Sequence, residues 1–199
     1  MQATGVGYDV MVVGTSWGGL DAVRTLLSGL PGTFGMAVTV VQHRHKDSTH
    51  MLRSLLQERT PMPVREVEDK MPIEHGCVYV APSDYHTLIE PGHFSLSTEA
   101  PVRYSRPSID VTFLSAADSY GHRAVGVVLT GASVDGTEGL KRISERGGMV
   151  VVQDPATAES SLMPAAAAKA VPRARVMPLE EMVRFLAMLP VAGTERDAS

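Results

Sequence analysis

Residues 8–19, YDVMVVGTSWGG, form the stretch that decides the fold. The apolar run at 10–13 predicts a buried strand, and Gly14-Thr15-Ser16-Trp17-Gly18 predicts a tight turn into a helix. The pentapeptide matches G-x-S-x-G, a pattern that holds a serine on a sharp turn beside backbone N–H groups. Ser16 is therefore a candidate acyl-transfer nucleophile. The alternative is a glycine-rich turn that binds phosphate or only redirects the chain.

Length and composition suit one α/β domain, because the chain has 199 residues and 44% of them are hydrophobic. A net charge of −4 without a basic block argues against a nucleic-acid partner. No apolar run approaches the ~18 residues of a membrane span, and a single cysteine excludes an internal disulfide framework. The first strand follows the N-terminus too closely for a signal peptide. We expect a cytoplasmic protein with a flexible leader (1–8), one domain (9–190) and a disordered tail (191–199).

The order of elements predicts a doubly wound, mostly parallel sheet in a three-layer αβα arrangement. Near-continuous apolar runs at 36–42, 124–130 and 149–153 are typical of parallel strands that helices cover on both faces. Short strands are also expected at 64–67 and 175–177. Short β-prone segments at 77–81, 85–90 and 94–97, separated by turn residues, predict an antiparallel ribbon appended to the sheet. A helix that opens at 106–110 should turn Ile109, Phe113, Leu114 and Ala117 inward.

Three side chains that could form a hydrolytic triad follow the carboxyl ends of predicted strands: Ser16, His43 and Asp135. Ligands bind at that edge of an open parallel sheet, and neighbouring strands lie about 5 Å apart. A neutral imidazole at His43 would accept the Ser16 proton, and Asp135 would orient the imidazole. The order Ser, His, Asp differs from the Ser, Asp, His of α/β-hydrolases, which argues against an ordinary member of that fold.

Other candidates have simpler interpretations. Asp154 is expected to organise a loop before Pro155, and Asp110 to serve the first turn of its own helix. Arg106 is left open between substrate contact and a structural role. His43, His45 and His50 lack the ligand spacing of a metal site, so no metal is expected. Three further expectations are that Cys77 is a buried hydrophobe, that Ser48 caps the helix after the second strand, and that the histidines at 75, 86, 93 and 122 lie on the surface, with His86 a possible cleft residue.

The chain resembles the catalytic domain of the chemotaxis receptor methylesterase family, CheB, from about residue 10 to residue 189. The segments that carry the resemblance, in order, are GTSWGGLDA, VVQH, VYVAPSDYH, RPSIDVTFLSAA, GVVLTGASVDGTEGL, GGMVVVQDPATAESSLMPAAA and MPLEEM. By position, the resemblance implies that Ser16, His43 and Asp135 are the catalytic residues. It also implies that the backbone N–H of Ala132, where methionine is usual, belongs to the oxyanion hole.

The resemblance implies a cofactor-free hydrolase that acts on glutamate γ-methyl esters of chemoreceptor cytoplasmic helices, and in some members deamidates receptor glutamines. The expected partner is a methyl-accepting chemotaxis receptor. Family members usually carry an N-terminal receiver domain, so a separate regulatory or receiver protein is a further expected partner. Residues 44–47 and Trp17 depart from the family pattern and would line the substrate groove. A non-catalytic module that docks on receptor or signalling helices remains the alternative.

Overall fold

A seven-stranded parallel sheet forms the centre of the protein, which we describe from a computed structural model over residues 7–43 and 51–192. Its strand order is β3-β4-β2-β1-β7-β8-β9. The strands are β1 (Val10–Thr15), β2 (Ala37–Gln42), β3 (Val64–Glu66), β4 (Val78–Val80), β7 (Ala124–Val128), β8 (Met149–Gln153) and β9 (Arg175–Met177). The helices are α1 (Gly19–Ser28), α2 (Met51–Gln57), α3 (Ile109–Tyr120), α4 (Thr137–Glu145), α5 (Leu162–Ala170) and α6 (Leu179–Ala187).

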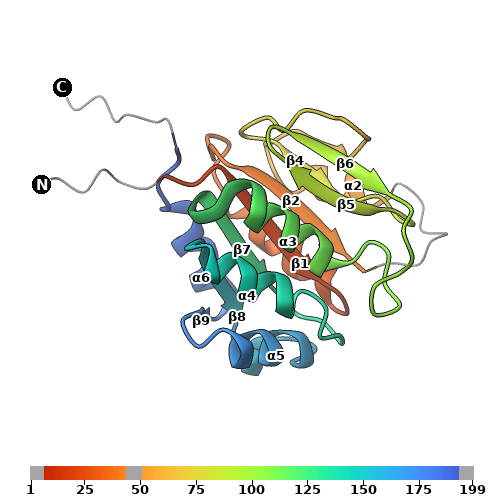
Figure 1. The fold of residues 1–199 in the computed structure, drawn as a ribbon. Helices are drawn as coiled ribbons and strands as arrows, with labels where there is room; N and C mark the ends of the chain where they lie inside the picture. The colour runs from red at the N-terminus through yellow and green to blue at the C-terminus, as the bar shows by residue number, and fades with distance from the viewer. Residues whose placement is uncertain (1–6, 44–50, 193–199) are drawn as a thin grey trace, which may run out of the picture.

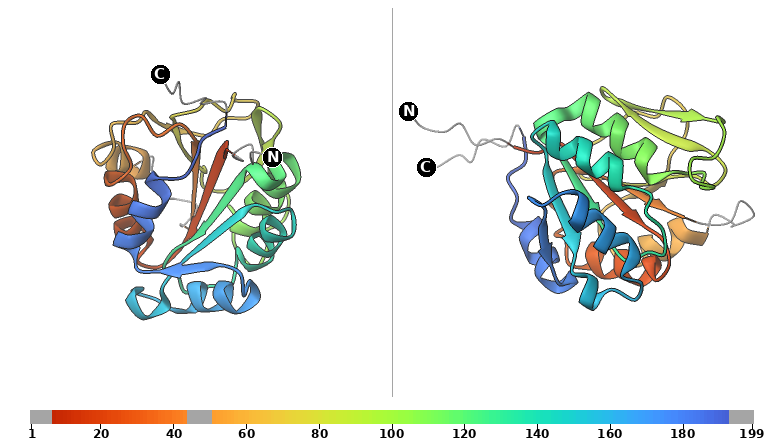
Figure 2. Two further views of the ribbon diagram at one scale, coloured as in Figure 1. Left: turned by 90° about the vertical axis from the view of Figure 1, so that its left-hand side faces the viewer. Right: turned by 60° about the horizontal axis from the view of Figure 1, so that its bottom comes forward.

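Helices cover both faces of the sheet. One apolar core joins α1, α2 and α6 to one face, and a second joins α3, α4 and α5 to the other. The left view of Figure 2 shows α1 and α6 on one side of the strands and α3 and α4 on the other. This three-layer, doubly wound arrangement confirms the predicted fold class. Because the chain leaves β1 toward β2 in one direction and later adds β7 on the other side, the strand order reverses at β1. Ligand crevices form at such a point.

A separate antiparallel ribbon of β5 (His86–Glu90) and β6 (His93–Ser97) packs against α3 (Figure 1). Three hydroxyls of α3 bind the backbone of β5: Thr112 Oγ1 donates to Thr87 O, Ser119 Oγ to Ile89 O, and Ser115 Oγ accepts from Ile89 N.

The prediction that residues 77–81 belong to this ribbon was wrong. They contain β4, which pairs in parallel with β2 and β3 inside the main sheet. The reason is burial, since Val78, Tyr79 and Val80 are fully enclosed on both faces, as an inner parallel strand requires.

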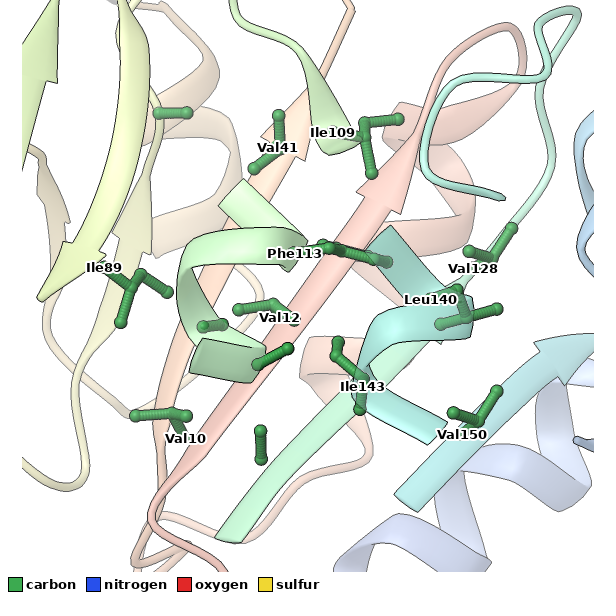
Figure 3. Close-up of a cluster of buried hydrophobic side chains, with 14 of the residues drawn as sticks. Val10, Val12, Val41, Ile89, Ile109, Phe113, Val128, Leu140, Ile143 and Val150 are labelled. Carbon is green, nitrogen blue, oxygen red and sulfur yellow. The ribbon is translucent and has the colours of Figure 1, made fainter. Parts of the chain in front are cut away.

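Helix α3 lies directly on the central strand. Ile109 and Phe113 are fully buried above β1 (Figure 3), and a Cβ added to Gly14 would come within 2.4 Å of Ile109 Cγ2. Glycine at position 14 therefore sets how closely the helix approaches the strand. Ala117 is buried as predicted, but Leu114 is 38% exposed, so its predicted inward orientation was wrong. It falls between the inward positions of the helix.

Ordered structure extends past the predicted domain bounds at both ends. Tyr8 and Val191 form a parallel bridge, in which Tyr8 N donates to Pro190 O and Ala192 N donates to Tyr8 O. Residues 1–6 of the predicted leader and 193–199 of the predicted tail lie outside the described residues. Within the described ranges, no helix has the length and apolar content needed to cross a membrane.

A buried carboxylate joins α3 to α4. Asp110 Oδ1 accepts a hydrogen bond of 2.8 Å from the backbone N–H of Gly139, in the first turn of α4. The pKa of Asp110 is raised to about 6, chiefly because the carboxyl is buried. The negative charge of Asp135 also raises this pKa, whereas the hydrogen bond from Gly139 and the positive charge of Arg103 lower it. Because the pKa is above that of an unfolded aspartate, the stability contributed by this group is complete below pH ~4 and is lost as the pH rises through about 6.

The substitution Asp110→Asn removes this titration. Between pH 4.5 and pH 7.5 the unchanged protein should lose stability that the variant keeps, so we expect the free energy of unfolding of the variant minus that of the unchanged protein to increase by about 2 kcal/mol. Urea denaturation at the two pH values measures the difference. An effect of equal size at both pH values would show that Asp110 is not titrating in this range.

Phe113 and Leu114 give a matched pair of neighbours on one helix. Phe113→Ala should lower the free energy of unfolding by about 3–5 kcal/mol because it leaves a cavity over β1. Leu114→Ala, at a partly exposed position, should cost less than about 1 kcal/mol. Chemical denaturation of both variants tests whether Phe113 faces the core and Leu114 faces solvent. Similar losses of unfolding free energy in the two variants would contradict this orientation of α3.

Candidate active site

Ser16 stands one residue beyond the end of β1, between the ends of β2 and β7. Its N–H donates to Thr130 O at 3.1 Å, and the N–H of His43 donates to Thr15 O at 3.1 Å. These bonds continue the ladders of β1 with β7 and with β2 beyond the strand ends. Gly18, at φ 73°, then turns the chain into α1. The side chains of Ser16 and His43 thus start from adjacent positions, as the sequence predicted.

His43 reaches the aspartate. Its Nε2 lies 2.7 Å from Asp135 Oδ2, although 92 residues separate the two in sequence. Asp135 is completely buried, whereas His43 is partly accessible. With an ionised Asp135, Nε2 carries the proton and donates it, which leaves Nδ1 as the basic nitrogen of a neutral ring. No hydrogen bond joins Ser16 to this histidine in the structure as described.

Five donors surround the Asp135 carboxylate. Oδ1 accepts from Ser108 Oγ (2.9 Å) and from the N–H groups of Asp110 (3.0 Å) and Gly136 (3.0 Å). Oδ2 accepts from Ile109 N and His43 Nε2, both at 2.7 Å. Burial is the largest single influence and would raise the pKa of Asp135. The hydrogen bonds from His43 and from the first turn of α3 together outweigh it, so the pKa lies below that of an ordinary aspartate.

Asp135 keeps the contact with His43 that was predicted, but it also binds the helix that sequence reasoning assigned to Asp110. Asp110, in the first turn of α3, binds an N–H of α4, while Asp135, just before α4, binds the free N–H groups of α3. The N-terminus of α3 is therefore bound by a carboxylate from the loop before α4, and the first turn of α4 by a carboxylate from α3. The expectation that Asp110 serves its own helix was wrong, because Asp135 already occupies those donors.

Thr130 fixes the loop beside Ser16. Its Oγ1 donates to Trp17 O at 3.0 Å and accepts from Ser160 N at 2.9 Å, so three loops share one hydroxyl. Gly131 follows, where an added Cβ would come within 3.0 Å of Ser16 Cβ and 2.8 Å of Met163 Sδ. Only glycine leaves the serine room to stand against this loop.

An open cavity of about 420 Å³ contains the candidate nucleophile and base. Its lining includes Ser16, His43, Trp17 and Glu159, and Trp17 is 67% exposed. The Glu159 carboxylate lies against Gly18, at the N-terminal end of α1, where a helix dipole favours negative charge. A larger cavity, about 550 Å³, lies elsewhere along β3 and contains none of these groups.

Ala132 lies on the exposed loop that follows β7. Its N–H has no acceptor in the described part of the chain, and the same holds for the N–H of Trp17, which follows Ser16. Both donors belong to loops that Thr130 holds together.

Two other polar residues considered for the site, Asp154 and Arg106, have structural roles. Asp154 accepts from Ala156 N and organises its loop, as predicted. Arg106 is structural, because its guanidinium binds Asp84 and the carbonyls of Thr98 and Glu99.

The burial of Cys77 and His86 tests two further predictions. Cys77 is buried, as predicted, and its Sγ lies 3.8 Å from a Glu74 oxygen. His86 was wrongly expected on the surface: it is 2% exposed, accepts from Ser108 N and bonds Ala100 O. His45, His50 and Ser48 lie outside the described residues. Among the residues that are described, no group of three or more His, Cys, Asp or Glu side chains is arranged to hold a metal ion.

Sequence reasoning missed the groups that hold Asp135. Ser108 precedes α3 as an N-cap residue should, yet its hydroxyl donates to Asp135 instead of capping its own helix. A serine just before a predicted helix was the only available signal. Glu159 was also missed, because no sequence pattern indicates that this exposed loop glutamate lies beside Ser16.

The comparisons with known proteins agree with this geometry. A profile of the CheB methylesterase family matches residues 11–186. A Leptospira interrogans protein named putative protein-glutamate methylesterase/protein-glutamine glutaminase is 43% identical over 95% of this chain and 98% of its own length. The crystal structure of the Thermotoga maritima CheB methylesterase catalytic domain superimposes with a TM-score of 0.86 at 29% identity, covering 92% of this chain and 98% of that one.

Other relatives are longer. This chain spans about half of the Myxococcus xanthus protein-glutamate methylesterase FrzG, with 36% identity over 88% of this chain and 53% of that protein. The match to an Anaeromyxobacter dehalogenans methylesterase/glutaminase is similar, at 39% identity over 89% of this chain and 52% of the relative. On the family match, the relatives and the shared fold together, the chain belongs to the CheB methylesterase family.

Proposed function

We propose that this protein is a serine esterase that hydrolyses glutamate γ-methyl esters on the cytoplasmic helices of a methyl-accepting chemotaxis receptor, releasing glutamate and methanol. One observation carries the proposal: a buried, ionised Asp135 binds His43, and His43 lines the same cavity as Ser16. The names of the relatives support the substrate class.

In the first half-reaction, Ser16 Oγ attacks the ester carbonyl carbon while His43 Nδ1 takes the hydroxyl proton. Asp135 stabilises the imidazolium that forms and holds its tautomer. The oxyanion accepts hydrogen bonds from the N–H of Ala132 and from that of Trp17, the residue after the nucleophile. When the carbon–oxygen bond to the methoxy group breaks, the imidazolium returns the proton and methanol leaves a glutamyl-enzyme.

In the second half-reaction, a water molecule takes the place of methanol. His43 removes its proton, the resulting tetrahedral intermediate collapses, and the free glutamate leaves as Ser16 recovers its hydrogen. Replacement of methanol by ammonia as the leaving group gives deamidation of glutamine by the same steps. The relative named protein-glutamine glutaminase supports this second substrate.

Methanol release from a methylated receptor preparation tests the function directly. We expect release to depend on the protein, with loss of the methyl label from receptor glutamates. A module that only docks on receptor helices would bind the preparation and release none.

Ser16→Ala should abolish this activity. We expect turnover to fall by about 10⁴- to 10⁶-fold, the range seen when a triad serine is removed, because none of the other described residues that line the cavity has a hydroxyl or thiol side chain. Thermal unfolding should change little, since the Ser16 side chain makes no hydrogen bond within the described structure. Ser28→Ala, on the exposed end of α1, is the control. Retention of a tenth of the activity in Ser16→Ala would remove Ser16 from the mechanism.

Asp135→Asn should lower turnover by at least about 10²-fold, because an amide favours the wrong imidazole tautomer. The variant should also lose stability, since the amide nitrogen meets donors where the carboxylate accepted hydrogen bonds. Activity is therefore measured well below the melting temperature of the variant.

Two controls separate catalysis from folding. Ser108→Ala removes one hydrogen bond to Asp135 but leaves the carboxylate, and Asp154→Asn alters a loop carboxylate. Each should keep turnover within about tenfold. A fully active Asp135→Asn, with Asp154→Asn inactive, would assign the third catalytic position to Asp154.

A further inference from the structure

We propose that the carboxylate of Glu159, which lines the cavity with Ser16 and His43, makes the site selective by charge. It admits the neutral γ-methyl ester and disfavours the free glutamate that the reaction produces. The inference rests on the proposed function and concerns the substrate preference of the same cavity. Because the product remains part of the receptor helix, each hydrolysis turns a substrate side chain into a competitor, and a like charge in the site is a way to reject it.

Glu159 is held beside the candidate nucleophile by the next residue in the chain. Ser160 N donates to Thr130 Oγ1 at 2.9 Å, and Ser160 O accepts from Gly131 N at 3.1 Å. Ser160 Oγ also donates to Gly131 O at 3.0 Å. Thr130 O in turn accepts from Ser16 N, and Gly131 lies against the Ser16 side chain. The loop that carries Glu159 is therefore attached to the same framework as the serine.

The Glu159 carboxylate occupies the space that Gly18 leaves open by having no side chain. A Cβ added to Gly18 would come within 2.5 Å of Glu159 Oε2 and 2.9 Å of its Cδ. Gly18 is two residues from Ser16, a span of at most about 7 Å. Because all three residues line one cavity, the negative charge lies close to the place where the ester carbonyl is attacked.

This charge is not neutralised within the described part of the chain. Glu159 is exposed, and its carboxylate takes part in no hydrogen bond or ion pair with another described residue. The described lining of the cavity includes a second carboxylate, Asp21, but neither lysine nor arginine. Asp21 differs from Glu159 because Arg24 Nη1 lies 3.4 Å from its Oδ1. Glu159 is thus the carboxylate whose field reaches the cavity without a paired cation among the described residues.

The net charge of the reacting groups changes only when the product forms. The methyl ester is neutral, and in the transition state the positive imidazolium of His43 accompanies the negative oxyanion. Free glutamate carries a full negative charge at neutral pH. A fixed carboxylate therefore acts mainly on the product. For two unit charges about 7 Å apart, at a dielectric constant of about 40 to 80, the repulsion corresponds to about three- to sevenfold weaker binding.

The test compares Glu159→Gln with the unchanged protein. The substrate is a receptor helical fragment with one glutamate γ-methyl ester, and the inhibitor is the same fragment with free glutamate at that position. We expect the ratio of Ki for the free fragment to KM for the ester fragment to fall by about three- to sevenfold in the variant. Since exposed charges are screened by salt, the difference between the two proteins should shrink at about 1 M salt.

Two matched variants each remove one negative charge at another position. Glu145→Gln alters an exposed residue at the end of α4 that leads into β8, at the opposite edge of the sheet, and should leave the ratio unchanged. Asp21→Asn alters the second carboxylate of the cavity and should have a smaller effect than Glu159→Gln, because Arg24 already offsets that charge. Calorimetry in a Ser16→Ala background gives the Kd of both fragments without turnover.

The outcomes separate this proposal from the proposed function. Methanol release with an unchanged ratio in Glu159→Gln removes the charge selectivity and keeps the esterase. A Kd ratio that falls with Glu159→Gln in the Ser16→Ala background, when the unchanged protein releases no methanol, removes the esterase and keeps the charge selectivity. A rise of more than about fivefold in KM for the ester fragment in Glu159→Gln would assign the carboxylate to binding a positive group of the receptor helix, and would overturn its role in rejecting the product.

Discussion

The buried carboxylate of Asp135 is the interaction on which the rest of the structure depends. A charge without solvent is costly unless hydrogen bonds replace its water, and here five donors from His43, the start of α3, Ser108 and Gly136 do so. The same group thereby fixes α3 at its N-terminus, holds the loop after β7 and orients the imidazole. Asp110 completes the arrangement by capping α4, so that two helices and the candidate triad share one electrostatic unit.

Backbone and small residues do the remaining positioning. Gly14 lets α3 lie on β1, and Gly131 lets the loop after β7 approach Ser16, so the nucleophile stands between two close contacts. Thr130 then ties three loops with one hydroxyl. Such contacts leave little freedom for the loops that carry the N–H groups of Trp17 and Ala132, and the oxyanion role that we propose for these donors requires a rigid pair.

The sequence predicted the layers and the neighbourhood of Ser16 and His43, because apolar runs define parallel strands and parallel strands end at one edge. It failed where the deciding contact was non-local or involved backbone. Residues 77–81 have the length of a ribbon strand, and only their burial between β2 and β3 distinguishes them. The donors to Asp135 include N–H groups of residues 109 and 110, which any residue except proline could supply. No sequence pattern therefore predicts such a contact.

The exchange of caps between α3 and α4 has a consequence for how relatives are compared. An aspartate at position 135 serves folding as well as chemistry, so a descendant that had lost catalysis would still be selected to keep it. Its retention is weak evidence of an active enzyme. The Ser16 hydroxyl makes no hydrogen bond to any other part of the described structure, so the serine is under no comparable folding constraint. In this family, the serine is therefore the position whose loss would first mark a decayed enzyme that still folds.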